Sequence, residues 1–322
     1  MIDHGARRPR VVTLGETMAL ARTVETGSLR HVSSLALGIG GAESNVAIAL
    51  SRLGVDVSWL GRVGDDPLGE RVLREIRAEG VEVLGIVDPD APTGLMLKER
   101  ATASATSVYY YRSASAGSRL SPGDLPDGWV EGAAILHICG ITALVSESGH
   151  AALTAAIDRA KAAGVLVSFD VNFRSSLASA GDAAPVLRGL AEQADIVFGG
   201  PEEAALLGCG ESPEDIAEQL RGSGVSELVL KQGALGATAF TGSGAEESPG
   251  FLVQAVDTVG AGDAFVAGYL SAYLEGRTVA ERLVRANACG AIACTSPGDW
   301  EANPTLRDLK RFIAPAGDPV NR

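Results

Sequence analysis

The sequence predicts an α/β fold: a three-layer α/β/α core with a mostly parallel sheet, and a small β-sheet that projects from the core as a lid. Short apolar runs alternate with helical patterns through most of the chain, which is typical of parallel strands covered by helices on both faces. Two segments, 17–37 and 93–112, interrupt this order with alternating polar and apolar residues, as in half-exposed antiparallel strands or hairpins. We therefore assign these segments to the lid, and residues 1–16, 38–92 and 113–322 to the core.

Each element of this fold follows from a local pattern. The apolar runs predict strands that are buried on both faces, at 11–15, 55–61, 81–87, 134–139, 165–171, 194–199 and 227–233. The segments between them predict helices at 43–53, 67–79, 149–163, 184–193 and 213–222. At 231–237 one strand ends and another begins through a glycine turn, and beyond residue 260 long apolar helices are expected at 261–274 and 279–295.

The chain is acidic, with 27 Lys and Arg residues against 40 Asp and Glu residues and a formal net charge of −13. Nucleic acids and membrane surfaces are polyanions, so this charge argues against both as general partners. Only four lysines are present and none follows a glycine, which excludes the G-x-x-x-x-G-K-[ST] phosphate loop. No G-x-G-x-x-G follows the first predicted strand, which disfavours a dinucleotide-dependent oxidoreductase.

The four cysteines, Cys139, Cys209, Cys289 and Cys294, have no C-x-x-C spacing and no nearby histidine ligands. A structural zinc site is therefore not expected, and reduced thiols are the better interpretation. The longest apolar stretch, 132–145, is interrupted by polar residues and is shorter than a membrane span. We expect a cytoplasmic protein.

The string V-D-T-V-G-A-G-D-A-F at 256–265 stands at the start of an apolar helix. A loop of small residues that opens a helix leaves backbone N–H groups free beside the positive end of the helix dipole, which favours anion binding. Gly260 and Gly262 let a phosphate approach the backbone, and Asp263 in the first turn is placed to accept a proton from an attacking hydroxyl. The alternative is an ordinary acid that stabilises a helix N-terminus.

This string resembles the C-terminal signature of the PfkB (ribokinase-like) carbohydrate kinase family. The family's N-terminal signature is matched by G-G-A-E-S-N-V-A at 40–47 and G-R-V-G-D-D-P-L-G at 61–69. The resemblance implies a ribokinase-like fold and a sugar kinase that uses ATP and Mg²⁺, with a monovalent cation as a further candidate cofactor. It also implies an anion hole of Gly260, Ala261 and Gly262, Asp263 as the catalytic base, and sugar-hydroxyl contacts from Gly40, Gly41 and Asn45.

For the nucleotide, the family's K-x-G-x-x-G is matched by K-Q-G-A-L-G at 231–236, although many hairpins show the same pattern. The residues implied at the nucleotide are Lys231, Gly233, Gly236, Thr258, Gly260, Gly262 and Asn287. The family's N-x-x-E aligns with 200–203, which implies that Glu203 binds Mg²⁺ through water. Gly200 replaces the expected Asn, and Glu203 could instead be a first-turn helix acid after Pro201.

Two arginines give evidence about the chemical class of the substrate. Tyr110 and Arg112 end the second lid segment, and Arg174 belongs to D-V-N-F-R after a core strand, on the side where ligands bind in open α/β sheets. Two arginines in one pocket suit a carboxylate, because the guanidinium group is planar and bidentate. Both motifs resemble family members that phosphorylate 2-keto-3-deoxygluconate, a sugar acid, at its terminal hydroxyl. This implies that Tyr110 and Arg112 bind the acid end and Arg174 contacts substrate or phosphate.

Several alternatives stay open at this point. The tyrosines could pack a dimer, and Arg174 could pair with Asp170. Met96 stands where these kinases often have Tyr, so fructose, ribose and other sugar acids remain candidate substrates. A non-catalytic sugar-binding protein on the same fold is a further alternative. Because a projecting lid has exposed strand edges, which proteins tend to cover, we also expect a homodimer formed through the lids.

Overall fold

Nine strands form one large sheet in the computed structural model, which describes residues 11–102, 105–208 and 212–314. The strand order is β13-β12-β11-β10-β9-β8-β1-β4-β5, and every pairing from β11 to β5 is parallel. The parallel strands are β1 (Val11–Leu14), β4 (Val57–Gly64), β5 (Glu82–Asp88), β8 (Ile135–Cys139), β9 (Leu166–Asp170), β10 (Ile196–Gly199) and β11 (Glu227–Lys231). The antiparallel strands β12 (Gly236–Thr241) and β13 (Gly244–Pro249) extend one edge.

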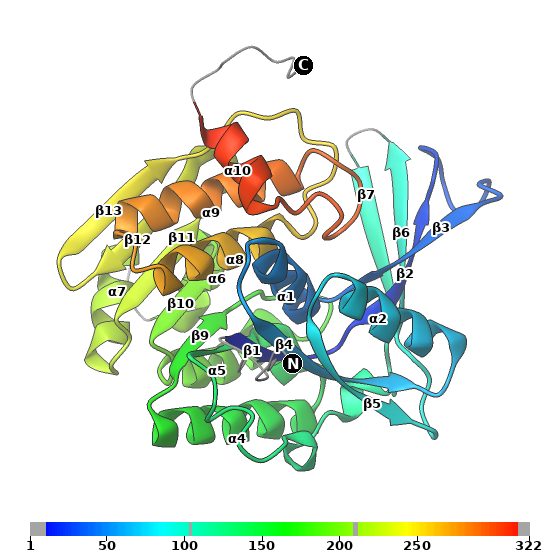
Figure 1. Ribbon diagram of the computed structural model, residues 1–322, viewed down its shortest axis with the longest axis horizontal. Helices are drawn as coiled ribbons and strands as arrows, with labels where there is room; N and C mark the ends of the chain where they lie inside the picture. Colours follow the sequence, from blue (N-terminus) through cyan, green and yellow to red (C-terminus); the bar gives the residue numbers. More distant parts are fainter. Residues whose placement is uncertain (1–10, 103–104, 209–211, 315–322) are drawn as a thin grey trace, which may run out of the picture.

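Helices cover both faces of this sheet, which confirms the three-layer prediction (Figure 1). One face packs against α1 (Ala42–Arg52), α2 (Pro67–Ala78), α8 (Ala261–Leu274) and α9 (Val279–Ala293). The other packs against α3 (Gly140–Val145), α4 (Glu147–Ala163), α5 (Ala180–Ala191), α6 (Pro201–Leu207) and α7 (Pro213–Gly222). A hydrophobic core lies on each face of the sheet, and successive residues of a strand point into opposite cores. Val11 packs with the first group of helices and Val12 with the second.

All seven predicted core strands are present, but one prediction about them is wrong. β5 is not buried on both faces, because it forms the open edge of the sheet and its residues from Val83 to Ile86 are only half-buried. The helix α5 begins at Ala180 rather than 184, because the Ser179 hydroxyl accepts a hydrogen bond from Asp182 N and caps the helix there. The short helices α3, α6 and α10 (Leu306–Ile313) were not predicted from periodicity.

The lid is a separate four-stranded sheet in the order β3-β2-β6-β7, and it projects to one side of the core (Figure 1). Its strands are β2 (Met18–Thr23), β3 (Leu35–Gly40), β6 (Leu95–Thr102) and β7 (Ala105–Tyr111). Each predicted segment supplies one antiparallel hairpin, and a parallel pairing of β2 with β6 joins the two hairpins. β3 continues beyond residue 37 to Gly40, because it stays paired with β2 as far as Met18.

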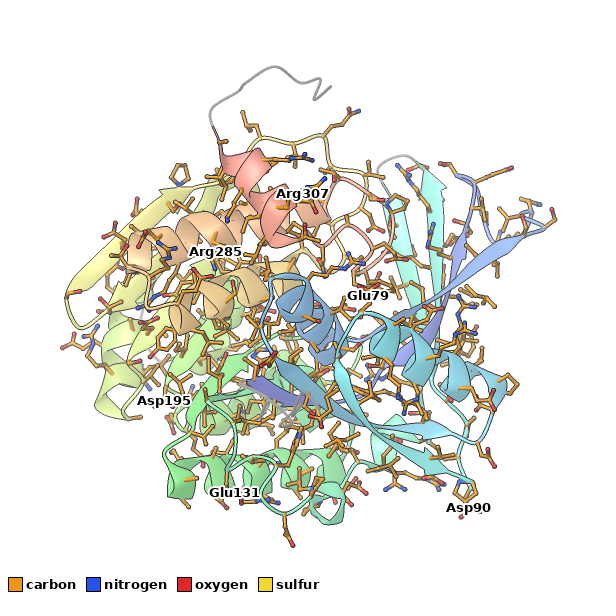
Figure 2. The ribbon with its side chains drawn as sticks, viewed as in Figure 1. Glu79, Asp90, Glu131, Asp195, Arg285 and Arg307 are labelled. Atoms are coloured by element: carbon orange, nitrogen blue, oxygen red, sulfur yellow. The ribbon has the colours of Figure 1, made fainter. Side chains whose placement is uncertain are left out.

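Charged side chains on the outside of the core form ion pairs, and Figure 2 shows Arg285 and Glu131 in different parts of the surface. Arg285 on α9 pairs with Glu275, and Arg159 on α4 pairs with Glu131. Such exposed pairs contribute little to stability, about 0–1 kcal/mol each. Within the described ranges, no helix is long and apolar enough to cross a membrane.

Candidate active site

A cavity of about 460 Å³, called the central cavity here, lies between the lid and the carboxyl ends of the parallel strands. The strands β1, β8, β9 and β10 are each followed by a lining residue, in that order Glu16, Ile141, Asn172 and Gly200, and β11 ends with the lining residue Lys231. This edge of an open α/β sheet is where ligands bind. The lid contributes Met18, Met96, Val108 and Tyr110, whose side chains share its inner face.

The central cavity brings together every residue that the sequence assigned to the sugar. These residues are Gly40, Gly41, Asn45, Tyr110, Arg112, Arg174 and Asp263. Gly260, Gly262, Thr258, Lys231 and Glu203 also line it. Met96, the residue found where a tyrosine was expected, lies on the same wall.

A second cavity of about 360 Å³, called the side cavity, adjoins the first and shares Lys231, Thr258 and Gly262 with it. Its walls are mostly small or apolar, and they include all the residues predicted at the nucleotide except Gly260, which lines the central cavity. Its apolar lining residues include Phe251, Leu252, Val253, Ala255, Ala261 and Phe265. The Asn287 amide donates to Ser248 O at 3.0 Å, so this side chain also ties α9 to β13.

Gly260 is the N-cap of α8 and has a left-handed backbone, with φ +80°. A Cβ at this position would lie 1.8 Å from Asp299 O, so only glycine fits there. The helix begins with the bond from Ala264 N to Gly260 O at 2.9 Å. The preceding N–H groups of the first turn have no acceptor within the helix. Ala261 N donates to Thr258 O at 3.3 Å, and Gly262 lines both cavities.

Asp263 is buried in this first turn and receives hydrogen bonds from two asparagines. Asn45 Nδ2 donates to Oδ2 at 2.8 Å, and Asn172 Nδ2 lies 3.5 Å from Oδ1. Burial raises the pKa of Asp263 to about 7, and the Asn45 hydrogen bond opposes this rise. Asn45 Oδ1 is buried without a hydrogen-bond partner in the described part of the chain, so an acceptor is left beside the carboxylate.

The alternative that Arg174 pairs with Asp170 is wrong. Asp170 instead accepts two hydrogen bonds from Lys231 Nζ, at 2.7 and 2.8 Å. Although burial favours the neutral amine, the negative charges of Asp170 and Glu203 raise the pKa of Lys231. Arg174 is exposed at the rim, and its Nη1 donates to Phe173 O at 3.3 Å. Among the described residues, Arg174 has no carboxylate within ion-pair distance.

Glu203 caps the helix α6. Its Oε2 accepts from Gly200 N at 2.6 Å, and its Oε1 accepts from Phe173 N at 2.8 Å. The carboxylate therefore does occupy the first turn after Pro201, and it also faces the central cavity. Across residues 11–102, 105–208 and 212–314, no group of three or more His, Cys, Asp or Glu side chains is arranged to hold a metal ion.

Two buried acids of the site were not predicted. Glu16 accepts from Arg112 Nε at 2.7 Å and from the Ser115 hydroxyl, so part of the Arg112 guanidinium is already paired. Glu43 accepts from Thr142 Oγ1 at 2.6 Å, and burial raises its pKa to about 7. Glu16 follows the first core strand, a position that could have identified it as a residue at the carboxyl edge of the sheet.

The α/β fold thus places the start of helix α8 next to a buried carboxylate at the carboxyl edge of the sheet. The model of the pfkB family carbohydrate kinases matches residues 8–306, and the chain belongs to this family. It is therefore a carbohydrate kinase, a phosphotransferase of a family that uses ATP and binds a sugar. The non-catalytic alternative is thereby disfavoured.

Relatives of known name cover nearly the whole chain. The 2-dehydro-3-deoxygluconokinase of Bacillus subtilis is 37% identical, over 94% of this chain and 95% of its own. The 2-dehydro-3-deoxygalactonokinase of Haloferax volcanii is 36% identical, over 97% and 99%. Fructokinase-1 of Zea mays is 33% identical, over 97% and 99%, so these similarities do not decide between sugar acids and fructose.

A solved structure shares the fold and carries a nucleotide. It is a proposed ribokinase II from E. coli in complex with ATP and Mg²⁺, with 26% identity and a TM-score of 0.88 over 95% of this chain and 99% of that one. The similarity agrees with the ribokinase-like fold expected from the sequence.

Proposed function

We propose that this kinase transfers the γ-phosphoryl group of ATP to the terminal hydroxyl of 2-keto-3-deoxygluconate and releases the 6-phosphate and ADP. The observation that carries the proposal is the central cavity, which holds a buried carboxylate, a helix N-terminus and two arginines together. In the reaction, the hydroxyl oxygen forms a bond to the γ-phosphorus and the bond to the ADP oxygen breaks. The hydroxyl proton goes to Asp263 Oδ.

Asp263 suits this role because its carboxylate is buried, hydrogen-bonded in place and has a pKa of about 7. A general base works best when its pKa is close to the working pH. Gly40, Gly41 and Asn45 would contact the sugar, and the unpaired Asn45 Oδ1 offers an acceptor for one of its hydroxyls. The N–H groups of Gly260, Ala261 and Gly262 would receive the charge that develops on the phosphoryl oxygens.

ATP would place its base in the side cavity and its phosphates beside Lys231 and Thr258, which line both cavities. The small and apolar walls suit a flat base. Mg²⁺ is commonly held by one or two carboxylates together with substrate phosphates and water, so Glu203 alone fits as a water-mediated ligand. When bound, Mg²⁺ neutralises charge on the phosphates. A monovalent cation stays an expectation from the family resemblance.

The sugar-acid end would lie between Arg174, Arg112 and Tyr110. Because Glu16 already neutralises part of Arg112, we assign the main carboxylate contact to Arg174, which has no carboxylate partner among the described residues. The Tyr110 ring lies 5.9 Å from the Arg112 guanidinium carbon and would hold this arginine against the lid.

An ADP-release assay with 2-keto-3-deoxygluconate, 2-keto-3-deoxygalactonate, fructose and ribose tests the substrate. We expect the first to give the highest kcat/KM. Arg174→Gln should lower kcat/KM for both acids by about 10- to 100-fold, because this factor corresponds to the free energy of one charge-assisted hydrogen bond. The kcat/KM for fructose should not change. The exposed Arg307, marked in Figure 2, gives the matched control Arg307→Gln. Strong turnover of fructose with none of the acids would overturn the substrate.

Replacement of the base tests the mechanism separately. Asp263→Asn keeps the size of the side chain and removes its ability to accept the proton, so kcat should fall by about 100- to 10,000-fold. Calorimetric titration should show that ATP still binds. Turnover close to the wild-type value would refute the assignment of Asp263 as the base.

We also propose a homodimer formed through the lids. The outer face of the lid carries a row of paired residues across all four strands, namely Leu37, Ala21, Leu97 and Tyr109. Leu37 is 52% exposed and Tyr109 is 47% exposed, so the row has uncovered apolar area at both ends. Light scattering should show a dimer, and Leu37→Arg should shift it toward monomer. A wild-type monomer at micromolar concentration would contradict this.

A cytoplasmic location belongs to the same proposal. ATP is available there, and a reducing compartment suits the unpaired thiols of Cys139, Cys289 and Cys294. The fourth cysteine, Cys209, lies outside the described residues.

A further inference from the structure

The lid strand β6 carries a buried lysine that the proposed reaction does not use. Lys98 is only 4% exposed, although lysine side chains are seldom buried without a partner. It lies two residues from Met96 and therefore on the inner face of the lid, toward the core. Its stem thus runs from the lid into the junction with the core.

Two core carboxylates surround the ammonium group of this lysine. Lys98 Nζ lies 2.5 Å from Asp257 Oδ2 and 2.9 Å from Asp299 Oδ1, and both acidic side chains are nearly buried. Burial raises the pKa of Asp299, and the Lys98 ammonium opposes this rise. One positive charge therefore faces two neighbouring carboxylates in a place with little water.

Both carboxylates belong to the chain segments that hold Gly260. Asp257 Oδ1 accepts from Val259 N at 3.2 Å, and Asp257 Oδ2 accepts from Gly298 N at 3.2 Å. A Cβ added to Gly260 would lie 1.8 Å from the backbone oxygen of Asp299, so this oxygen stands directly beside the Gly260 backbone. The position of the α8 N-terminus thus depends on the same side chains that bind the lid lysine.

We propose that Lys98 is a positioning residue for phosphoryl transfer: its ammonium fixes the 257–260 and 298–299 segments, and so makes the position of the α8 N–H groups depend on the lid. The proposal rests on the proposed role of these N–H groups. Without the ammonium, two buried carboxylates would repel each other, and they would separate or take up a proton. Either response displaces Val259 and Gly260 from the phosphate.

Lys98→Met tests the charge, because methionine keeps most of the apolar stem. We expect kcat/KM for ATP to fall by about 10- to 100-fold, as for a misplaced catalytic group, while KM for the sugar changes by less than about twofold. Lys161→Met, at an exposed position on α4, is the matched control and should behave as wild type. Wild-type kcat and KM for ATP in Lys98→Met would overturn the proposal.

A second variant separates charge from packing. Lys98→Met/Asp299→Asn replaces the repelling carboxylates by a carboxylate and an amide, so it should regain part of the ATP kcat/KM lost in Lys98→Met. A purely structural role of the lysine stem predicts no such recovery, and its absence would refute the proposal. If Lys98→Met does not fold by circular dichroism, the double variant is compared with Asp299→Asn alone. The double variant should then have a lower kcat/KM for ATP than Asp299→Asn, by less than the 10- to 100-fold loss expected of Lys98→Met. Equal values in the double variant and Asp299→Asn would refute the proposal.

These outcomes are independent of the proposed substrate and base. Each Lys98 variant is measured as a ratio to wild type with whichever sugar the wild-type enzyme turns over. The sugar panel and Asp263→Asn can therefore fail while the Lys98 effect stands, and the reverse also holds.

Discussion

Replacing Asn45 by leucine removes the shorter of the two hydrogen bonds to Asp263 and keeps a side chain of similar size. Asn45 Nδ2 donates to Asp263 Oδ2 at 2.8 Å, and this bond holds down a pKa that burial has raised to about 7. A hydrogen bond to a charged group contributes about 1.5–3 kcal/mol, and one pKa unit corresponds to about 1.4 kcal/mol. The pKa of Asp263 should therefore rise by about one to two units in Asn45→Leu.

The sign of the effect on activity follows from the role of the base. Asp263 must be ionised to accept the proton, so wild-type kcat/KM should fall tenfold per pH unit below about pH 7. In Asn45→Leu the ionised fraction at pH 7 drops from about one half to about 3%, if the pKa rises by about 1.5 units. Activity at pH 7 thus falls by roughly 15-fold on this account alone, and this part is recovered above about pH 9.

The assay is the pH profile of kcat/KM for the sugar, measured by ADP release in wild type and Asn45→Leu. A lost sugar contact lowers kcat/KM equally at all pH values, whereas the pKa effect moves the acid limb of the profile. Asn172→Gly is the comparison, since its bond to Asp263 is longer, at 3.5 Å, and glycine tolerates its φ of +39°. Its acid limb should move less. An acid limb of Asn45→Leu that coincides with the wild-type limb would refute the reasoning.

Three further predictions concern the surroundings of the site. Gly260→Ala should lower the free energy of unfolding by about 1–3 kcal/mol and abolish ATP binding in calorimetry, because its Cβ would strike Asp299 O at φ +80°. Gly262→Ala, whose Cβ would meet only Lys231 Nζ at 3.5 Å, should unfold as wild type. Glu43→Gln should be more stable than wild type by about 3 kcal/mol in urea unfolding at pH 9 and equal at pH 4. The folded pKa of Glu43, about 7, lies above the ordinary value of a glutamate, so wild type loses stability as the pH rises. Equal midpoints at both pH values would contradict this. Asp170→Asn should weaken ATP binding by calorimetry, because Lys231 loses the carboxylate that holds its Nζ; unchanged affinity would argue against Lys231 as a phosphate ligand.

Much of the core could be predicted because its signals are local. Short apolar runs predict the buried strands, and apolar patterns predict α1, α2, α4, α7, α8 and α9. Of these helices, α2, α4, α7 and α9 also have a side chain that caps the start. The helices α3, α6 and α10 were not predicted because they are short. For example, α6 has seven residues and is defined by Pro201 and a Glu203 cap rather than by an apolar face. The exposure of β5 was not predicted, because an edge position depends on the order of the strands in the sheet. The residues of β5 alone do not indicate that order.

The sequence by itself determined the family signatures and thus which side chains gather at the carboxyl edge of the sheet, because a strand followed by a loop or helix start is a local feature. Only the tertiary structure decided how those charges pair. Arg112 meets Glu16 across 96 positions of sequence, Lys231 takes Asp170 away from Arg174, and Lys98 reaches Asp299 across 201 positions. Such pairs form only where the lid packs on the core and the strands take their order. Which carboxylate lies within reach of a given cation is therefore a property of that packing.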